Sequence, residues 1–510
     1  MRLLTCNQAS ELDRISMIEK GIASKILMGN AGKCVSKKAE EIIHDFKNPL
    51  ILVLCGKGNN GGDGFAAASE LYHKKYTIYI HSIVEEKNIN GDSVYYFQDC
   101  VSLGIPITFG MDHSNLKAPD LIIDALLGTG LKGAVRQDMV PFINWINEND
   151  KKVISIDIPS GLNGNSGMVD PISVKADETI TFGAPKLGMY FRKGPEFCGN
   201  VALADIGFPK INTVELPGLV WDSFNEDRAK ESLSKPKLDM HKYDSGKVLI
   251  IAGSSGMTGA AILSTYGALR SGAGLTITTS PRSLNDIYER SIIEGMTLPL
   301  DDNSAGVLSI NNFDSIMEKV DWADSVLLGP GLGRDNSTQE LIKHLVRNVN
   351  KPLILDADGL FPFSDDINQL NEREYPLIIT PHFGELARLK GIKTKALVSE
   401  FPDIITDLMQ VFDKTVLAKQ VPVCVFEGNE AIINTSGNPG LATAGTGDVL
   451  AGMISGFLSQ GHSNLNAATL GAFIHGKASD IIASEKGYRG QIASDLLAKV
   501  PDVIKEYERA

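Results

Sequence analysis

The sequence predicts an α/β protein in which two units each build a parallel sheet covered by helices. Short apolar runs of strand type alternate with helical segments along most of the 510 residues. A stretch with little periodicity, residues 208–245, divides this alternation into two halves. Each half opens with an apolar run that leads directly into a glycine-rich turn, at residues 50–64 and 247–256. This layout is typical of parallel sheets with helices on both faces.

In the first half, the apolar runs predict five strands with helices between them. These strands lie at residues 50–55, 76–84, 121–128, 152–158 and 178–184. An early helix is predicted from Ser10 as its N-cap, Asp13 three residues later and Gly21 at its far end.

In the second half, further strands are predicted at residues 247–256, 325–331, 352–358, 376–381 and 415–419. Helical stretches follow to the end of the chain. The prolines, charges and polar residues between the halves read as a linker and a domain entry. The predicted division is therefore a first domain of residues 1–215, a linker at 216–235 and a second domain of residues 236–510.

Composition narrows the class of protein. Apolar residues make up 43% of the chain and charged residues 22%, which favours a soluble globular protein. A net charge of −13 disfavours broad binding to nucleic acid or to anionic membranes. No apolar run approaches the roughly 20 residues that span a bilayer, and the N-terminus does not resemble a secretory signal. The six scattered cysteines read as free thiols in a reducing compartment, so the cytoplasm is expected.

The first glycine-rich turn, "GKGNNGGDG" at residues 56–64, fits neither the dinucleotide fingerprint nor a Walker A loop. A tight turn alone does not require three of its residues, Asn59, Asn60 and Asp63. Amide and carboxylate oxygens suit a hard cation or sugar hydroxyls. The turn therefore predicts a ligand-binding wall.

Two other strand ends carry matching groups. Asp124 is followed by a second glycine loop, Gly128–Ala134, which contains Lys132, and Asp157 ends a strand three residues before Ser160. Each feature alone is most simply a cap or a turn. Because three strand ends of one doubly wound sheet converge on the same edge, together they predict one cleft.

The strongest motif of the second half precedes a predicted helix. Gly445, Thr446 and Gly447 come directly before its apolar stripe, and Asp448 lies in its first turn. Backbone N–H groups at a helix start can stabilise developing negative charge. An isolated aspartate there would be a simple cap, but Gly-Thr-Gly-Asp before an apolar helix resembles the ribokinase superfamily. There the glycines hold the phosphate in transfer and the aspartate accepts the proton of the hydroxyl.

Together these motifs resemble the bifunctional NAD(P)H-hydrate repair enzymes. "GNNGGDG", "DALLGTGLKG" and "DIPSG", in this order, are similar to their N-terminal epimerase domain over about residues 1–215. "HKYDSGKVLIIAGSSGMTGAAILS", "GPGLG", "LDADGL" and "TPHFGELARL" are similar to their C-terminal dehydratase domain over about residues 225–505. The resemblance implies a Rossmann-like three-layer domain followed by a ribokinase-like α/β domain.

The resemblance also implies roles for the residues of the first domain. Lys132 and Asp157 would be the catalytic proton-transfer pair. A potassium ion would be held by Asn60, Asp124 and Ser160. The hydrated dinucleotide would be bound by Asn59, Asn60, Gly61, Gly62, Asp63, Gly128, Thr129, Gly130, Leu131, Lys132, Gly133, Ala134 and Asp157.

In the second domain, Asp448 would be the catalytic residue. The substrate of the dehydration would contact Ala260, Gly331, His382 and Asp448. The nucleotide would contact Lys419, Gln420, Val421, Pro422, Val423, Gly445, Thr446 and Gly447. The chain departs from the family pattern at residues 420–423 and at Thr443–Ala444, both on the nucleotide side.

The implied activity is metabolite repair by an isomerase joined to a lyase. The first domain would interconvert R- and S-NAD(P)HX, and the second would dehydrate S-NAD(P)HX to NAD(P)H at the expense of ADP or ATP. The expected cofactors are potassium and magnesium, the latter with the nucleotide. The expected partners are NADHX, NADPHX and ADP or ATP, with no nucleic acid and no membrane, in a homo-oligomer.

Two alternatives stay open on the residues alone. A ribokinase-type small-molecule kinase would explain the Gly-Thr-Gly-Asp helix but would leave the first domain idle. A non-catalytic dinucleotide sensor would have no need of Lys132, Asp157 or Asp448.

Overall fold

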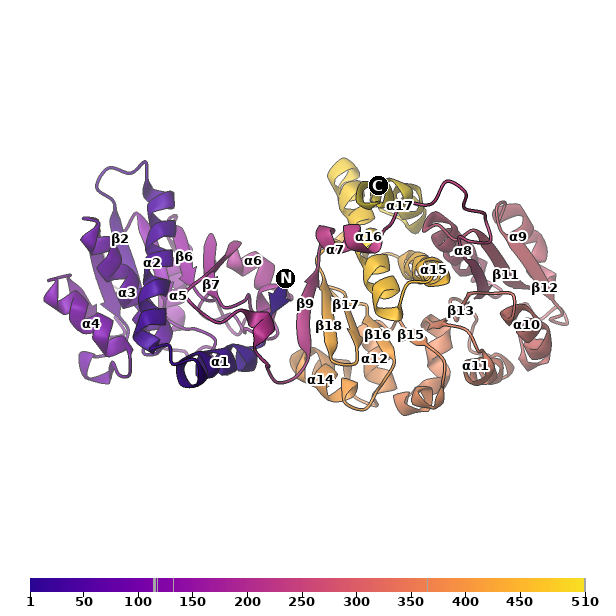
Figure 1. Cartoon of the computed structure of the whole chain (residues 1–510), viewed down its shortest axis with the longest axis horizontal. Coiled ribbons are helices and arrows are strands. Elements are labelled where there is room, and N and C mark those ends of the chain that lie inside the picture. Colours follow the sequence, from indigo (N-terminus) through magenta and orange to yellow (C-terminus); the bar gives the residue numbers. More distant parts are fainter. Residues whose placement is uncertain (113–115, 117, 132, 365, 509–510) are drawn as a thin grey trace. The chain divides into compact units, whose positions relative to one another are not determined.

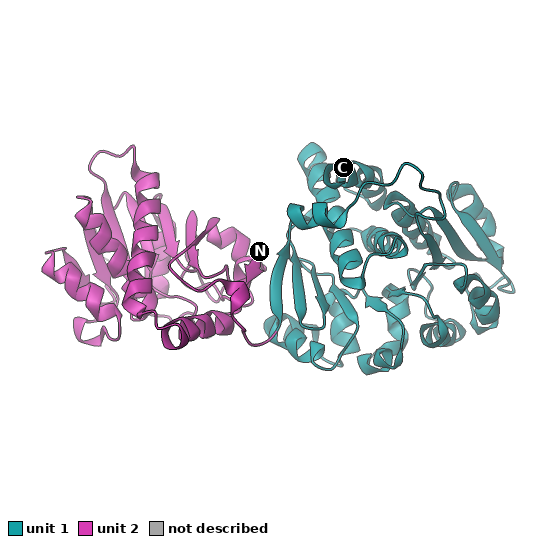
Figure 2. Ribbon diagram, viewed as in Figure 1, with its two compact units in different colours: residues 1, 219–510 teal, residues 2–218 magenta. Residues whose placement is uncertain are grey.

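The computed structural model describes residues 1–112, 116, 118–131, 133–364 and 366–508. These residues form two compact units, one of residues 2–218 and one of residues 219–510 together with Met1 (Figure 2). None of the helices within the described ranges combines the length and the apolar character needed to cross a membrane.

The described residues of the N-terminal unit form a seven-stranded parallel sheet in the order β4-β3-β2-β5-β6-β7-β8 (Figure 1). The strands are β2 (Leu50–Cys55), β3 (Thr77–Ser82), β4 (Ile107–Phe109), β5 (Leu121–Ala125), β6 (Lys152–Ile156), β7 (Glu178–Phe182) and β8 (Asn200–Ala204). The strand order reverses between β2 and β5. Such a switch point opens a crevice at the carboxyl ends of the strands, where ligands of open α/β sheets bind.

Helices cover both faces of this sheet. The unit begins with β1 (Arg2–Leu3), α1 (Cys6–Arg14) and a π-helix, η1 (Ile15–Glu19), and its other helices are α2 (Ser24–Ile43), α3 (Asn59–His73), α4 (Ser93–Ser102), α5 (Val140–Glu148) and α6 (Gly194–Cys198). Side chains alternate along β2, so Ile51 and Val53 join the core beneath α2, α3 and α4. Leu52 and Leu54 join the core that contains Phe142 of α5. The result is three layers.

The start of α1 differs from the sequence prediction. Thr5, not Ser10, is the N-cap: its hydroxyl accepts the backbone N–H of Gln8 at 3.1 Å, and the Gln8 side chain accepts the N–H of Thr5 at 3.0 Å. This reciprocal pair is a capping box. Ser10 and Asp13 therefore lie inside the helix rather than at its cap.

In the C-terminal unit, the strands from β9 onward follow the order β9-β18-β17-β16-β15-β14-β13-β10-β11-β12. They are β9 (Val220–Phe224), β10 (Lys247–Ile251), β11 (Leu275–Pro281), β12 (Met296–Leu300), β13 (Ser325–Leu328), β14 (Leu353–Leu355), β15 (Leu377–Ile379), β16 (Thr415–Ala418), β17 (Cys424–Glu427) and β18 (Glu430–Asn434). Pairing is parallel from β12 to β16, and β17 is antiparallel to both of its neighbours.

The helices of this unit are α7 (Glu226–Ser232), α8 (Thr258–Arg270), α9 (Asn285–Ser291), α10 (Phe313–Val320), α11 (Asn336–Asn348), α12 (Phe383–Leu389), α13 (Thr394–Ser399), α14 (Asp403–Met409), α15 (Thr446–Ser459), α16 (Asn464–Lys486) and α17 (Ala493–Tyr507). Helix α15 packs against both α8 and α16. Val449, Met453, Ile454 and Phe457 of α15 are each no more than 1% exposed and belong to the main core cluster. The predicted stripe is therefore buried, as is every other residue of the helix from Val449 to Ser459.

Every strand predicted from the sequence is present, although several end two to five residues earlier than predicted. The linker predicted at 216–235 is wrong for much of its length. It contains β9, which pairs with β18, and α7, so the division between the units falls between residues 218 and 219.

Candidate functional sites

A cavity of about 700 Å³ opens at the switch point of the N-terminal sheet. Its walls come from α1, the turn between β2 and α3, the loop after β5 and the ends of β6 and β7. Predicted substrate residues that line it are Asn59, Asn60, Asp63, Gly128, Thr129, Gly130, Leu131, Ala134 and Asp157. The three strand ends thus do form a single cleft.

Other predicted residues are not part of this lining. Gly61, Gly62 and Gly133 are not among the residues that line the cavity. Lys132, expected as the partner of Asp157 in proton transfer, lies outside the described residues.

The three predicted potassium ligands meet around the backbone of Leu127. The Asn60 side-chain amide donates to the Leu127 carbonyl at 2.9 Å, and the Leu127 N–H donates to the Ser160 hydroxyl at 2.8 Å. That hydroxyl donates to Asp124 at 2.5 Å. Burial raises the pKa of Asp124, although hydrogen bonds from Ser160, Ser155 and the Leu126 N–H oppose this effect.

One oxygen of this cluster has no partner among the described residues. Asn60 is only 9% exposed, yet its side-chain carbonyl oxygen accepts no hydrogen bond. A buried acceptor without a donor is costly. It is the kind of oxygen that a weakly hydrated cation would satisfy.

Asp157 forms an ion pair with Lys186, which the sequence analysis did not single out. Lys186 is 2% exposed and also donates to the Thr181 hydroxyl at 2.9 Å and to the Phe182 carbonyl at 3.1 Å. Asp157 itself has a φ of +63°, in the left-handed region that few residues other than glycine occupy. Strain of this kind, held by surrounding structure, is typical of functional sites.

Two more carboxyl groups line the same cavity. Burial, reinforced by the charge of Asp157, raises the pKa of Asp13 to about 6. Burial also raises the pKa of Asp63 well above its usual value, with added effects from Asp157 and Asp13. Lys57 and Arg136 line the cavity as well and bring positive charge to it.

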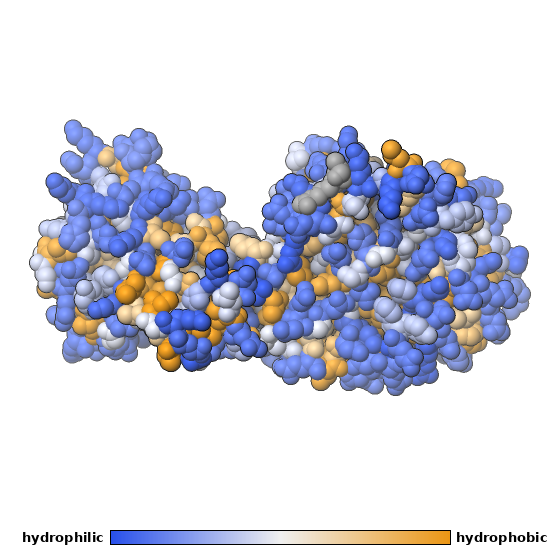
Figure 3. All heavy atoms as spheres, viewed as in Figure 1, coloured by the Kyte–Doolittle hydropathy of each residue, from blue (hydrophilic) through white to orange (hydrophobic). Residues whose placement is uncertain are grey.

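The wall formed by α1 and α2 is largely apolar. On the face shown in Figure 3, apolar residues gather on the N-terminal unit over the region that these helices occupy in Figure 1. Met17, Leu27 and Met28 line the cavity from this side. The cavity thus combines apolar surface with a few charged groups, as small-molecule sites commonly do.

The glycines of the first turn are explained by packing within the protein. A Cβ on Gly56 would lie 1.8 Å from the Leu126 carbonyl oxygen, and a Cβ on Gly61 would lie 2.1 Å from the Gly56 carbonyl oxygen. Gly62 and Gly64 are less crowded, with an added Cβ 2.5 Å from the end of the Met28 side chain and 2.6 Å from the Ala125 Cβ, respectively. Of these five glycines only Gly58 faces open space. Packing within the protein therefore accounts for the glycines at 56, 61, 62 and 64, but not for Gly58.

The second candidate site lies at the carboxyl ends of β13 to β16, where α15 begins. Lys419, just after β16, forms an ion pair with Asp356, just after β14, at 2.6 Å. A Cβ on Gly447 would lie 3.4 Å from the Lys419 ammonium nitrogen, so this cation sits at the first turn of α15. Free N–H groups and a lysine at one place make an anion-binding site.

Asp448 faces this charged group. Burial and then the charge of Asp356 raise the pKa of Asp448 to about 6, while Lys419 opposes the shift. Thr446 donates its hydroxyl to the Leu441 and Thr443 carbonyls, both at 3.0 Å, and so fixes the start of the helix. A carboxylate with such a pKa is suited to accept a proton near neutral pH.

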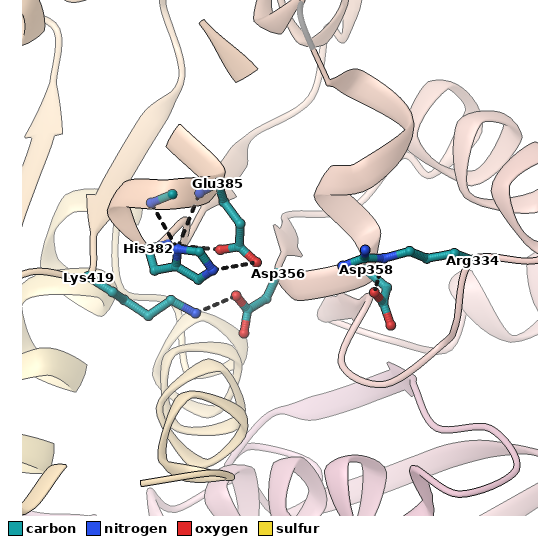
Figure 4. Close-up of polar contacts among 7 residues, drawn as sticks. Arg334, Asp356, Asp358, His382, Glu385 and Lys419 are labelled. Carbon is teal, nitrogen blue, oxygen red and sulfur yellow. Dashed lines mark hydrogen bonds and ion pairs between the residues drawn. The ribbon is translucent and has the colours of Figure 1, made fainter. Parts of the chain in front are cut away.

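A polar network borders the site (Figure 4). The His382 ring accepts the N–H groups of Gly384 and Glu385 at 2.9 and 3.2 Å, so this histidine caps α12. Glu385 accepts the His382 N–H at 2.9 Å, and burial raises the pKa of Glu385. In a separate pair, Arg334 donates to Asp358 at 3.1 Å.

The predicted dehydration residues divide into two groups. Gly331 and Ala260 are neighbours, since a Cβ on Gly331 would lie 2.9 Å from that of Ala260. Lys419, Gly447 and Asp448 form the second group. Residues 420–423 make the turn between β16 and β17, where Val421 is 77% exposed.

Several charged residues of the two sites were missed from the sequence. Asp356, Glu385 and Asp358 stand in the quoted motifs "LDADGL" and "TPHFGELARL", so the signal for them was present. Lys186 follows β7 in an irregular segment and had no such signal.

Comparison with known proteins agrees with this division. The family described as NAD(P)H-hydrate dehydratase matches residues 248–502, and the family described as YjeF-related protein N-terminus matches residues 24–188. A ribokinase-like superfamily protein of Enterococcus faecalis superimposes with a TM-score of 0.50 at 26% identity, covering 57% of this chain and 97% of that protein.

Full-length relatives have both halves in the same order. The bifunctional NAD(P)H-hydrate repair enzyme of Moorella thermoacetica is 34% identical, covering 100% of this chain and 97% of that protein. Its counterpart in Salinibacter ruber is 33% identical, covering 99% and 96%. The chain belongs to the family of bifunctional NAD(P)H-hydrate repair enzymes.

Proposed function

We propose that this chain epimerises R- and S-NAD(P)HX in its N-terminal unit and dehydrates S-NAD(P)HX in its C-terminal unit, with ADP or ATP as co-substrate. The observation that carries the proposal is the pairing of two strand-end sites with the family's two halves. One is a cavity that holds the Asp157–Lys186 pair, and the other is an anion site with Asp448 beside it.

In the N-terminal unit, Asp157 acts at the reacting end of the nicotinamide ring, with Lys132 as the proposed partner in proton transfer. The remaining cavity residues hold the dinucleotide. Lys57 and Arg136 supply charge for its phosphates, and the apolar wall takes its rings. A hydrated dinucleotide therefore finds both kinds of surface that its chemistry requires.

The buried oxygen of Asn60 fits the proposed potassium ion. Potassium would supply a positive charge that organises the Leu127 loop, which Asn60, Asp124 and Ser160 already contact. Replacing potassium by lithium should lower the thermal midpoint of the wild-type protein, and Asn60→Leu should abolish that difference. An equal midpoint in both salts would contradict the potassium site.

In the C-terminal unit, Asp448 accepts the proton of the added ring hydroxyl as that oxygen takes a phosphoryl group. The N–H groups at the start of α15 and the Lys419 ammonium stabilise the charge of the group in transfer. Phosphate then leaves with the help of the ring nitrogen, and loss of a proton from the neighbouring ring carbon to solvent forms the double bond of NAD(P)H. ADP or ATP enters as its magnesium complex, and Ala260, Gly331 and His382 are the proposed contacts to the dinucleotide.

A single assay tests both activities. Purified protein is incubated with mixed-epimer NADHX and magnesium with ATP or ADP, and the return of reduced-nicotinamide absorbance is followed. Complete recovery, faster than enzyme-free epimerisation allows, supports both steps. Recovery that stops at the S-epimer would contradict the epimerase, and no recovery would contradict the dehydratase.

A further inference from the structure

We propose that Asp13 of α1 is the general acid of the epimerase cavity and works opposite Asp157, an inference that rests on the proposed epimerisation and leaves Lys132 with substrate binding instead of proton transfer. Nothing in the sequence motifs gives Asp13 a chemical role, because its spacing from Ser10 reads as helix capping. The structure places it elsewhere, on the wall of the cavity.

The surroundings of Asp13 differ from those of an ordinary helix carboxylate. Its carboxyl group forms no hydrogen bond and no ion pair with any residue in the described ranges. Glu11, two positions earlier on the same helix, is paired with Arg14 at 2.8 Å and lies outside the cavity lining. Asp13 is thus a carboxyl group free to meet a ligand.

The charges around Asp13 favour its protonated form. Asp157 lines the same cavity and disfavours a further negative charge on Asp13, while the Lys186 ammonium partly opposes this effect. Cys6, on the same helix, has its pKa raised to about 11 by burial and is neutral. Burial and then the charge of Asp157 raise the pKa of Asp13 to about 6, so near neutral pH it can both hold and release a proton.

The chemistry of the substrate calls for such a group. Hydration places a hydroxyl on the ring carbon bonded to the ring nitrogen, which makes that carbon a hemiaminal. Inversion can proceed by opening its C–N bond. Asp157 accepts the hydroxyl proton as the C=O bond forms, the electron pair of the C–N bond moves to nitrogen, and Asp13 donates its proton to that nitrogen.

Closing the ring reverses each step. The aldehyde rotates about its bond to the neighbouring ring carbon and presents its other face to the nitrogen. Asp13 regains its proton from nitrogen as the C–N bond forms, and Asp157 returns its proton to oxygen. Nothing is oxidised or reduced, and both carboxyl groups end as they began.

The local structure holds Asp13 in position. The capping box at Thr5 fixes the start of α1, and the π-helix η1 begins two residues after Asp13. Turns of this kind inside helices occur often at functional sites.

The test uses the full chain and its own dehydratase. The S-epimer is first exhausted with ATP, and the conversion of the remaining R-epimer then reports epimerisation above the enzyme-free rate. Asp13→Asn should slow this phase about 100-fold, the loss expected for a general acid. It should also remove the decline in rate that wild type shows above about pH 6, because that decline follows deprotonation of Asp13.

Glu11→Gln is the matched control, a carboxyl-to-amide change on the same helix outside the cavity, and it should leave both phases unchanged. In Asp13→Asn the initial dehydration of the S-epimer should match wild type, and the thermal midpoint should be equal or higher. Asp13→Glu should recover part of the rate.

The outcomes are distinguishable. An Asp13→Asn protein with the wild-type rate and pH profile overturns the inference and leaves the proposed function intact. So does a slow variant that keeps the decline at high pH and melts earlier, because a structural role predicts that pattern. A wild type that converts the R-epimer no faster than the enzyme-free control overturns the epimerase itself, and the inference with it.

Discussion

At the residue scale, Lys186 is unusual because it is a lysine that lines the N-terminal cavity and yet is almost fully buried. Its ammonium group has three acceptors, from Asp157, Thr181 and Phe182, which leaves no donor free for substrate. We therefore interpret Lys186 as a positioning residue that holds Asp157 in its left-handed conformation.

Lys186→Met should both weaken the N-terminal unit and abolish epimerisation. It leaves the Asp157 carboxylate without its partner, and removing one side of a buried ion pair costs about 3–5 kcal/mol. Hydrogen exchange in β6 and β7 measures the loss, and the double variant Lys186→Met with Asp157→Asn should recover most of the protection but no activity.

Lys193→Met is the control for this experiment, because Lys193 pairs with Glu196 on the surface at 3.0 Å. An exposed pair contributes only about 0–1 kcal/mol. If Lys186→Met exchanged as slowly as Lys193→Met, the positioning role would be wrong.

The raised pKa of Asp448, the proposed base, predicts the pH dependence of dehydration. The group acts as a base only when ionised, and its pKa is raised to about 6. The rate with S-NADHX should therefore be constant above that pH and fall about tenfold per unit well below it. A profile set by an ordinary aspartate, flat down to about pH 4, would argue against this base.

The same shift has a consequence for stability. A carboxyl group whose folded pKa lies above its unfolded value lowers stability as pH rises through the interval between the two. Asp448→Asn should therefore raise the thermal midpoint of the C-terminal unit at pH 7 while removing dehydration. Thermal scans at pH 5 and pH 7 measure this, since the gain should be smaller at the lower pH.

The residues at strand ends could be predicted from the sequence. The charged groups that pair with them could not. Asp124, Asp157 and Asp448 each stand next to a glycine-rich turn or directly at a strand or helix end, where position alone implies the active edge of a parallel sheet. Lys186 meets Asp157 across 29 positions of chain, within a segment that has no periodic pattern. Only the folded chain brings them together.

At the scale of single elements, the start of α1 matters most, because it decides whether Asp13 caps the helix or lines the cavity. A start at Ser10 would have put Asp13 at the helix entrance as a capping group. The real start at Cys6, with Thr5 as cap, turns Asp13 toward the cavity. The observed cap, Thr5, lies five residues before the predicted one, and its capping box with Gln8 fixes the start of the helix.

The two caps can be told apart by alanine substitutions. Thr5→Ala should cost about 1 kcal/mol, the usual cost of losing an N-cap, and should also slow epimerisation because α1 presents Asp13. Ser10→Ala should cost nothing, since alanine is the best helix former at an exposed helical position. Hydrogen exchange of the α1 peptide distinguishes them, and a larger loss in Ser10→Ala would contradict the assigned cap.

Strands were recognised where they are buried and apolar. The strands that were missed include β4, which has three residues, β11, which is rich in threonine, and the hairpin of β17 and β18, which is joined by the short turn at Gly428–Asn429. Short or polar strands carry little periodic signal, and pairing with neighbours is what defines them.

At the scale of the whole molecule, each unit has its own core and its own site. The core clusters of the described residues do not mix side chains of residues 2–218 with those of 219–510. The two activities should therefore be separable by single substitutions. Although both sites lie on one chain, neither reaction needs the catalytic residues of the other.

A mixing experiment tests this separation. Asp157→Asn should dehydrate only the S-epimer, and Asp448→Asn should epimerise without producing NADH. An equimolar mixture of the two proteins should convert both epimers completely, because the S-epimer formed on one molecule can diffuse to another. A mixture that stops after the S-epimer is consumed would mean that both sites must act within one chain.

The crowding around the first turn limits how this site can vary. Gly56, Gly61, Gly62 and Gly64 are fixed by contacts within the protein, whereas Gly58 lines the cavity and has no neighbour within 4 Å of an added Cβ. A cysteine introduced at Gly58 could therefore carry a fluorophore without disturbing the fold. Position 58 is thus a natural place for an optical reporter of ligand entry, in a chain whose first site otherwise gives no signal of its own.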